Sequence, residues 1–373
     1  MTQQRRIGLK DIADATDLSV TTVSRVLSNK TPERFPNETR RRVIEVAESL
    51  DYRPNLLAVA ARGGSSRTIG VYLPPYDSFW TEVIYGVHDE LIDGDHVPLI
   101  LWPTHIRNAK SVHGVEGVPS DRISEVSQLH RMTDRAVDGM ILWPVVEADA
   151  RQYVAKLSAR GLPIVGVDHE PVEDDPVLMV GTDERASADL VANHLLSRGH
   201  RAIAQLAGPR QLFWARRRAE YFEERVGACS DAWCLTLPER APDVTRRALT
   251  SLLQPDPKVT AIYAATDELA RLVMTTSQEI GLRAGVDFAL VSVGDTGFAE
   301  GAGITSIRQR PYEIGKNAAE LVLAATRGEL TRGDRHERVL APELIVRDST
   351  ACPSEASSPP RQHQSRDTER HRL

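Results

Sequence analysis

The sequence lacks the features that define secreted, membrane-spanning and disulfide-stabilised proteins. Its only cysteines, Cys229, Cys234 and Cys352, have the spacing of neither a metal site nor a redox pair, which favours a reducing compartment. No apolar run approaches the length that spans a bilayer, and the N-terminus lacks the apolar core of a secretory signal. We therefore expect a cytoplasmic protein without a membrane segment.

Signatures of enzymes are equally scarce. No P-loop and no G-x-S-x-G motif occurs, and the glycines that begin at Gly301 lack the third glycine of a dinucleotide site. The triplet Asp295-Thr296-Gly297 matches half of an aspartic protease site, but that chemistry needs two carboxylates that share a proton, and no second triplet occurs. The long segment Trp102–Arg135 contains His105 and His113 without metal-ligand spacing. We expect no enzyme, no metal and no cofactor.

The charge of the chain is unevenly distributed. The net charge is −6, yet residues 1–66 contain eleven Lys/Arg and eight Asp/Glu, a balance of +3, so the remainder carries −9. A hydrophobic content of 41% in 373 residues is enough for two or three folded domains. A mildly basic head before an acidic body fits a small DNA-binding module, because phosphate neutralisation supplies most non-specific affinity.

The segment Leu9–Val26 predicts two short amphipathic helices joined by a tight turn. Ser19 is suited to cap the second helix by accepting a hydrogen bond from a first-turn N–H group. Apolar residues follow at helical spacing at Val23, Val26 and Leu27. The opposite face consists of hydroxyls and one guanidinium, from Thr21, Thr22, Ser24, Arg25 and Ser28. This pattern is typical of a helix-turn-helix unit, whose second helix enters the DNA major groove.

A third helix and a linker complete the N-terminal part. Glu38–Leu50 has one apolar side and begins with three arginines that are able to reach phosphate. Pro54 ends that region, and residues 55–62 allow about two helical turns, too few for stability in water without a partner. Gly63-Gly64-Ser65-Ser66 is a flexible linker. We divide the chain into a helix-turn-helix domain (1–52), a hinge helix with linker (53–66), a body (67–349) and a disordered tail (350–373).

From Thr68 the pattern changes to alternating strands and helices. Such alternation predicts parallel sheets covered by helices on both faces, an α/β body. About 280 residues exceed one comfortable core, so we expect two lobes. Ligands in such sheets bind outside the carboxyl ends of the strands. The expected elements are strands at 69–73, 97–102, 139–143, 164–167, 202–206, 261–265 and 290–293, and helices at 79–91, 122–136, 150–160, 184–198, 214–226, 268–281 and 311–327.

The chain resembles the LacI/GalR family of bacterial transcriptional repressors from about Gly8 to Thr350. The resemblance is carried, in the family's order, by LKDIADATDLSVTTVSRVL, TRRRVIEVAESLDYRPN, VDGMILWP, VGTDERASADLVANHLLSRGHRAIAQLAGP, ITSIRQRPYEIGKNAAELVL and PELIVRDST. It implies a dimer whose two heads bind a roughly palindromic operator. It also implies a periplasmic-binding-protein-like body that holds a small molecule, usually a sugar or related metabolite, between its lobes.

The resemblance also assigns DNA-contacting positions. Val20, Thr21 and Arg25 match the base-reading positions, where arginine suits guanine and the methyl groups suit thymine. Ser19, Thr22, Ser24 and Asn55 match positions that contact the DNA backbone, with Tyr52 packed beside them. At Ala61 the family normally has a leucine that wedges into the minor groove. Because alanine fills less of an opened base step, the kink should be weaker or carried by Leu56, Leu57 or Arg62, and we expect a weaker operator bend than a leucine-bearing relative produces.

The effector positions implied by the resemblance depart from the family pattern at one point. They are Phe79, Trp80, Asp168, Arg217, Thr266, Asp267, Asp295 and Gln309. The alignment at Arg217 is blurred by its neighbours Arg216 and Arg218. The usual ligand carboxylate after the strand at 290–293 is replaced by Gly294, with Asp295 one residue on. The ligand therefore need not be a standard hexose.

Two other functions share this architecture. A periplasmic solute-binding protein has the same two-lobed body but a signal peptide in place of the head, so residues 1–62 distinguish the two. A regulator of the same fold that responds to a phosphoprotein, or to no signal, is kept open by the altered position at Gly294. A DNA-binding repressor controlled by a small molecule is the main expectation.

Overall fold

The computed structural model describes residues 7–27, 35–54, 60, 64–74, 78–102, 124–143, 145, 147–168, 178–208, 212–237, 242–253, 259–330 and 336–351. The chain forms two compact units, residues 1–66 and 67–373, which we call the head and the body. In the described residues no helix is long and apolar enough to cross a bilayer.

In the described residues, the head is a bundle of three helices around one small core. The helices are α1 (Leu9–Thr16), α2 (Val20–Leu27) and α3 (Asn37–Ser49). Their core contains Ile12, Val23 and Val43, all inaccessible to solvent. The turn between α1 and α2 depends on Asp17, whose φ of 53° is left-handed, as expected for an aspartate at this position. The expected cap is also present, because the Thr22 N–H donates to Ser19 Oγ at 3.1 Å.

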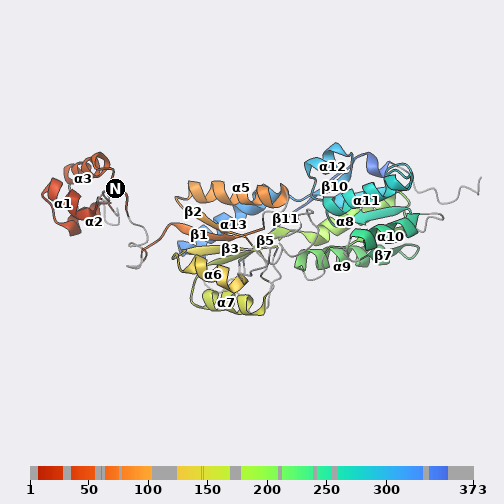
Figure 1. Cartoon of the computed structure of the whole chain (residues 1–373), viewed down its shortest axis with the longest axis horizontal. Helices are drawn as coiled ribbons and strands as arrows, with labels where there is room; N and C mark the ends of the chain where they lie inside the picture. The colour runs from red at the N-terminus through yellow and green to blue at the C-terminus, as the bar shows by residue number, and fades with distance from the viewer. Residues whose placement is uncertain are drawn as a thin grey trace, which may run out of the picture. The chain divides into compact units, whose positions relative to one another are not determined.

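The body contains two sheets of six strands each, and Figure 1 shows the helices that cover them. The first sheet has the order β11-β5-β4-β3-β1-β2 and the second β12-β10-β9-β8-β6-β7. Strand pairs are parallel except β10 with β12. The expected α/β body with two lobes is confirmed.

The N-lobe is the first sheet with α5, α6, α7 and α13, and the C-lobe is the second sheet with α8 to α12. The N-lobe elements are β1 (Thr68–Tyr72), α5 (Ser78–Asp93), β2 (Val97–Leu101), α6 (Glu125–Thr133), β3 (Gly139–Leu142), α7 (Ala148–Ala159), β4 (Ile164–Val167), β5 (Leu178–Thr182), α13 (Pro311–Thr326) and β11 (Glu337–Leu340). The C-lobe elements are α8 (Glu184–Ser197), β6 (Ala202–Leu206), α9 (Phe213–Gly227), β7 (Trp233–Leu237), α10 (Pro242–Leu253), β8 (Ala261–Ala264), α11 (Asp267–Glu279), β9 (Ala289–Val293), α12 (Gly297–Gly301), β10 (Thr305–Arg308), β12 (Glu343–Ile345) and the 3-10 turn η3 (Asp348–Thr350).

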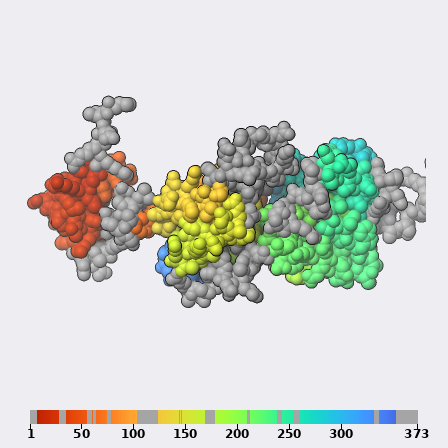
Figure 2. Space-filling view, turned by 60° about the horizontal axis from the view of Figure 1, so that its bottom comes forward, coloured from red at the N-terminus to blue at the C-terminus, as the bar shows by residue number. Residues whose placement is uncertain are grey.

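Each sheet is buried on both faces, as parallel strands require. In the C-lobe, for example, Ala204 and Ile262 face α10 and α11, whereas Ile203 and Tyr263 face α8 and α9. In the N-lobe, one face packs on α5 and α13 and the other on α6 and α7. Helices α6 and α7 form the yellow surface of the N-lobe in Figure 2, and the C-lobe shows its green elements there.

The chain passes between the lobes three times, after β5, after β10 and after β11. These crossings are bonded to one another. The Asp183 N–H donates to the Leu340 carbonyl at 3.0 Å, and Gln309 Nε2 donates to Thr182 Oγ1 at 3.1 Å. The three crossing segments are therefore linked as one hinge, and a change in the arrangement of the lobes must act on all three together.

Helices α5 and α13 approach each other through glycine, and they lie side by side in Figure 1. A Cβ atom on Gly86 would lie 2.0 Å from the Tyr312 carbonyl oxygen, and one on Gly315 would lie 1.9 Å from the Val83 carbonyl oxygen. Both obstacles are backbone atoms, so they cannot move aside as a side chain does.

We expect Gly315→Ala to lower the free energy of unfolding of the body by about 1–3 kcal/mol, because the added methyl group forces α5 and α13 apart. Urea denaturation followed by tryptophan fluorescence measures it, since all five tryptophans lie in the body. Gly227→Ala is the matched control, because nothing lies within 4 Å of its Cβ position on α9. Equal stability of the two variants would show that the glycine contact is not what fixes the helix spacing.

Candidate DNA-binding and effector sites

The exposed face of α2 is the candidate DNA interface. The helix buries Val23 and Val26 against the rest of the head. It leaves Thr21 and Arg25 exposed, and Val20 keeps 45% of its surface accessible. Val20 therefore belongs to the surface of the head and lies beside Thr21 at the exposed start of α2. The geometry thus brings together the side chains that the sequence assigned to base reading.

The remaining DNA-contact candidates are only partly described. Ser19 is exposed and caps α2, Thr22 and Ser24 are half-buried on the same helix, and the Ser19 and Thr22 hydroxyls lie 2.9 Å apart. Tyr52 packs against the edge of the head core, and its N–H donates to the Ala47 carbonyl at 2.9 Å. Ser28, Asn55 and Ala61 lie outside the described residues, so the contacts and the weak bend expected there stay predictions.

A cavity of about 360 Å³ lies between the lobes of the body. Its wall includes residues that directly follow β4, β8 and β9, which is the carboxyl end of parallel strands where ligands of such sheets bind. The volume is in the range of small-molecule sites. The cavity is lined by Ser78, Phe79, Trp80, Asp168, Trp214, Arg218, Thr266, Asp267, Glu268, Val293, Gly294, Thr296, Gly297, Phe298 and Gln309.

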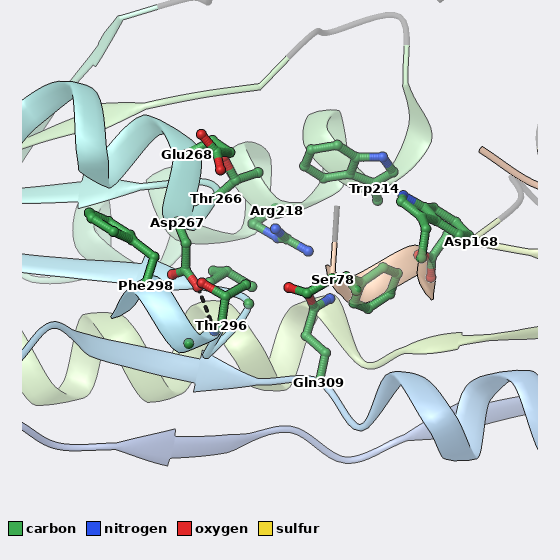
Figure 3. A pocket seen from close by; sticks show the side chains of 15 residues that line it. Ser78, Asp168, Trp214, Arg218, Thr266, Asp267, Glu268, Thr296, Phe298 and Gln309 are labelled. Carbon is green, nitrogen blue, oxygen red and sulfur yellow. Dashed lines mark hydrogen bonds between the residues drawn. The ribbon is translucent and has the colours of Figure 1, made fainter. Parts of the chain in front are cut away.

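Arg218 on α9 is the central cation of this cavity (Figure 3). Its Nε and Nη2 donate to the two carboxylate oxygens of Glu184 at 2.7 and 2.6 Å, and Nη1 donates to the Ala265 carbonyl at 2.5 Å. The guanidinium also stacks at 4.8 Å from the centre of the Trp214 ring. A guanidinium has five N–H donors, and within the described residues these three bonds leave two N–H groups without a protein partner.

The structure places Arg218, and not the predicted Arg217, in the wall of the cavity. Arg217 lies one position further round α9, outside the cavity lining, where its guanidinium stands over the rings of Phe213 and Tyr221. It also lies 3.4 Å from Glu220. The helical period of α9 could have identified Arg218. Trp214 and Arg218 are four residues apart, so they lie on the same face of the helix, next to the buried residue Ala215.

Asp168 follows β4 and lines the cavity with only 8% of its surface accessible. Its φ of 51° turns the chain there, and its Oδ1 lies 2.7 Å from where a Cβ of Gly181 would stand. A side chain on that neighbouring strand would therefore displace the carboxylate. Burial, followed by repulsion from Glu184, raises the pKa of Asp168 to about 7, although Arg218 acts in the opposite direction.

Asp267 is a buried carboxylate at the start of α11, directly after the Thr266 cap. Its Oδ1 accepts from the hydroxyls of Ser292 at 2.5 Å and Ser306 at 3.0 Å, and Oδ2 accepts from the Thr296 N–H at 2.8 Å. Burial raises its pKa, and these donors oppose the rise. Asp267 therefore lines the cavity while it also holds the loop after β9 in place.

Gly294 is required by that arrangement. Its φ is 135°, and a Cβ there would lie 2.8 Å from Asp267 Oδ2. A side chain at position 294 would therefore collide with the Asp267 carboxylate.

Asp295, in contrast, does not line the cavity. Its Oδ1 accepts from Arg347 Nη2 at 2.6 Å and its Oδ2 from Arg308 at 2.7 Å, and its side chain is 3% exposed. The effector role predicted for Asp295 is therefore not supported by its position.

Aromatic rings line the cavity from both lobes. Phe79 and Trp80, both predicted, come from α5, and Trp80 packs edge-on against Trp143 with ring centres 5.9 Å apart. Trp214 and Phe298 come from the C-lobe and were not predicted. Phe298 is 36% exposed and lines the cavity. The predicted Gln309 lines the cavity too, but its amide also bonds Thr182 in the hinge.

No group of three or more histidine, cysteine or carboxylate side chains suited to a metal ion occurs in the part of the chain that the structure describes. His105 and His113 lie outside that part.

Comparison with known proteins finds the same two parts. Residues 8–55 match the model of bacterial regulatory proteins of the lacI family, and residues 192–350 match a periplasmic binding protein-like domain. The transcriptional repressor CytR of Escherichia coli K12 is 25% identical over 356 residues, which cover 93% of this chain and 97% of CytR. The lac repressor dimer bound to operator and the anti-inducer ONPF matches with a TM-score of 0.75 at 20% identity over 93% of this chain and all of that one. The complex of the regulator CelR with cellobiose matches with a TM-score of 0.63 at 23% identity over 92% and 100% of the two chains.

Proposed function

The chain belongs to the LacI family of bacterial regulators, and we propose that it is a repressor that reads a pseudo-palindromic operator as a homodimer in the cytoplasm. The observation that carries this proposal is the exposed face of α2, where Val20, Thr21 and Arg25 project from a helix anchored by Val23 and Val26. A helix presented in this way fits the width of the major groove. The head also separates this chain from a solute-binding protein, which needs none.

The cavity of the body is the proposed effector site. Arg218 offers two N–H donors, and the carboxylates of Asp168 and Asp267 accept hydrogen bonds from hydroxyl groups. Aromatic rings on both lobes provide faces on which a sugar ring packs. These groups suit a polyhydroxylated metabolite of the size of a sugar.

The effector acts, in this proposal, by shifting the population of lobe arrangements. A ligand that touches both lobes favours one arrangement by its difference in affinity between the arrangements. The three bonded crossings transmit that choice through the body as one hinge. In a dimer, the choice changes the separation of the two linkers at residues 53–66, and so the fit of the heads to adjacent half-sites.

We expect Arg25→Ala to reduce the preference for the selected operator over random duplex by about 10- to 100-fold, because one bidentate guanine contact is lost. The operator is obtained by selecting random duplexes with the purified full chain, and fluorescence anisotropy then measures both affinities at fixed salt. Arg41→Ala is the control, since Arg41 lies on α3 and pairs with Glu45. A phosphate contact there would weaken all duplexes alike and leave the ratio unchanged. If selection enriches no sequence, or Arg25→Ala keeps the full ratio, the α2 proposal fails.

A further inference from the structure

The charges of the effector cavity do not balance. Arg218 is already matched by Glu184, at 2.6 and 2.7 Å, and both side chains are buried. Two more buried carboxylates, Asp168 and Asp267, line the same cavity. Neither forms a salt bridge with a lysine, arginine or histidine of the described residues. Within the described residues, the cavity wall thus has an excess of negative charge.

The two carboxylates differ in how their charge is stabilised. Asp267 accepts three hydrogen bonds, from two serine hydroxyls and one N–H group. Asp168 has one backbone donor, at Thr182, and it faces the charged pair of Glu184 on α8 and Arg218 on α9. Burying an ionised carboxylate without a neighbouring cation costs free energy, unless the carboxylate takes up a proton or pairs with a positive group of a ligand. The raised pKa of Asp168 has the same cause, since burial disfavours the charged form of its carboxyl group.

The position of Asp168 allows a ligand in the cavity to supply that positive group. Asp168 lines the open cavity, and in the view of Figure 3 it lies across the Arg218 guanidinium from Asp267. The two N–H groups of Arg218 that remain available suit hydroxyl or ether oxygens. Phe298 and Trp214 offer ring faces that attract both sugar C–H groups and cations.

We propose that the effector carries a protonated amine that pairs with Asp168, on a hydroxyl-rich body held by Arg218. The ligand class is then amino sugars and related amino polyols, in place of neutral sugars. This inference rests on the proposed function, because it takes the cavity as the effector site. It deepens that function by stating which charge the ligand must bring.

The test is a thermal unfolding experiment on the full chain at pH 7 with matched ligands. D-Glucosamine, D-galactosamine and D-mannosamine are compared at 10 mM with their parent hexoses and N-acetyl derivatives, with sodium chloride added to equalise ionic strength. We expect at least one amino sugar to raise Tm by several degrees, whereas its parent and its N-acetyl form do not, since a ligand stabilises the state it binds.

Two variants locate the effect. Asp168→Asn removes the charge but keeps the shape, so the shift given by the amino sugar should fall to that of the parent hexose. Asp189→Asn removes a carboxylate from the surface of α8, where it pairs with Arg225, and should leave the shift intact.

Each other outcome overturns the inference. A neutral hexose that stabilises as well as its amino form, or that does so only below pH 7, would show that the ligand need not supply the charge. An amino-sugar shift that survives in Asp168→Asn, or a complete lack of response to the amino sugars, would do the same. Stabilisation by neutral sugars would still support an effector site, and operator selection tests the regulator function separately.

Discussion

Replacing Glu184 by alanine is expected to lower the free energy of unfolding of the body by about 3–5 kcal/mol. Glu184 and Arg218 are 7% and 4% exposed, and they are joined by two short hydrogen bonds. Removing one partner leaves the other charge buried without compensation, which is why a broken buried pair costs so much. In this variant Asp168 still compensates part of the Arg218 charge, so we expect a loss nearer to about 3 than to about 5 kcal/mol.

The body offers a matched control for this experiment. Glu224 on α9 pairs with Arg185 on α8, the same two helices, but with side chains that are 63% and 56% exposed. Glu224→Ala should cost less than about 1 kcal/mol, because water already screens that pair. Urea denaturation by tryptophan fluorescence compares both variants with the parent. Similar losses for the two would mean that burial does not determine the contribution of the Glu184 pair.

Asp168→Asn is expected to stabilise the body at neutral pH by up to about 4 kcal/mol. The folded-state pKa is about 7, whereas the ordinary value is 3.8. The unfolded chain therefore holds the ionised form more easily than the folded chain, and each pKa unit of difference is worth about 1.4 kcal/mol. In the parent protein, protonated Asp168 favours the folded state at low pH. This contribution to stability is lost as the pH rises from about 4 to about 7, and no more is lost above that.

The pH dependence is the part of this prediction that a packing effect cannot imitate. The difference in stability between Asp168→Asn and the parent should be small near pH 4 and grow up to pH 7. It should then stay level to pH 8.5. Denaturation of both proteins at half-unit intervals measures it. A difference that does not change with pH would show that Asp168 titrates normally in the folded protein.

Much of the architecture could be predicted because local patterns and burial agree. Helix α2 follows from a capping serine and an apolar stripe, and both are found in place. Central strands such as β4 are continuous apolar runs because both of their faces are covered. These features depend on residues close together in the sequence.

The helices and strands without a prediction are β5, β7, β10, β11, β12, α10 and α12, and in several of them local pattern and final environment diverge. Strand β7 is at a sheet edge and leaves Trp233 46% exposed, so it lacks a buried run. Strand β10 has four residues, and β11 and β12 are short edge strands that come from the end of the chain. Helix α10 is amphipathic, but it follows a segment without clear boundaries in the sequence. Their pairing depends on partners far along the chain.

The candidate site shows the same limit at single residues. The family resemblance assigned Asp168, Thr266 and Gln309, and in the structure each follows a strand or lies where the chain crosses between lobes. The choice between Arg217 and Arg218 depends on the rotation of α9 against its sheet. The lack of room for a side chain at position 294 depends on the Asp267 carboxylate, which comes from a residue 27 positions away.

The sequence by itself determined a three-helix DNA-binding head, a two-lobed α/β body and the ends of strands where a ligand binds, because these follow from periodicity, caps and chain order. Only the tertiary structure decided which arginine lines the cavity, that Glu184 neutralises it, and that Asp168 and Asp267 form no salt bridge with a lysine, arginine or histidine of the described residues. The physical reason is that pairing and burial of charges are set by distances between separate elements, which packing alone fixes.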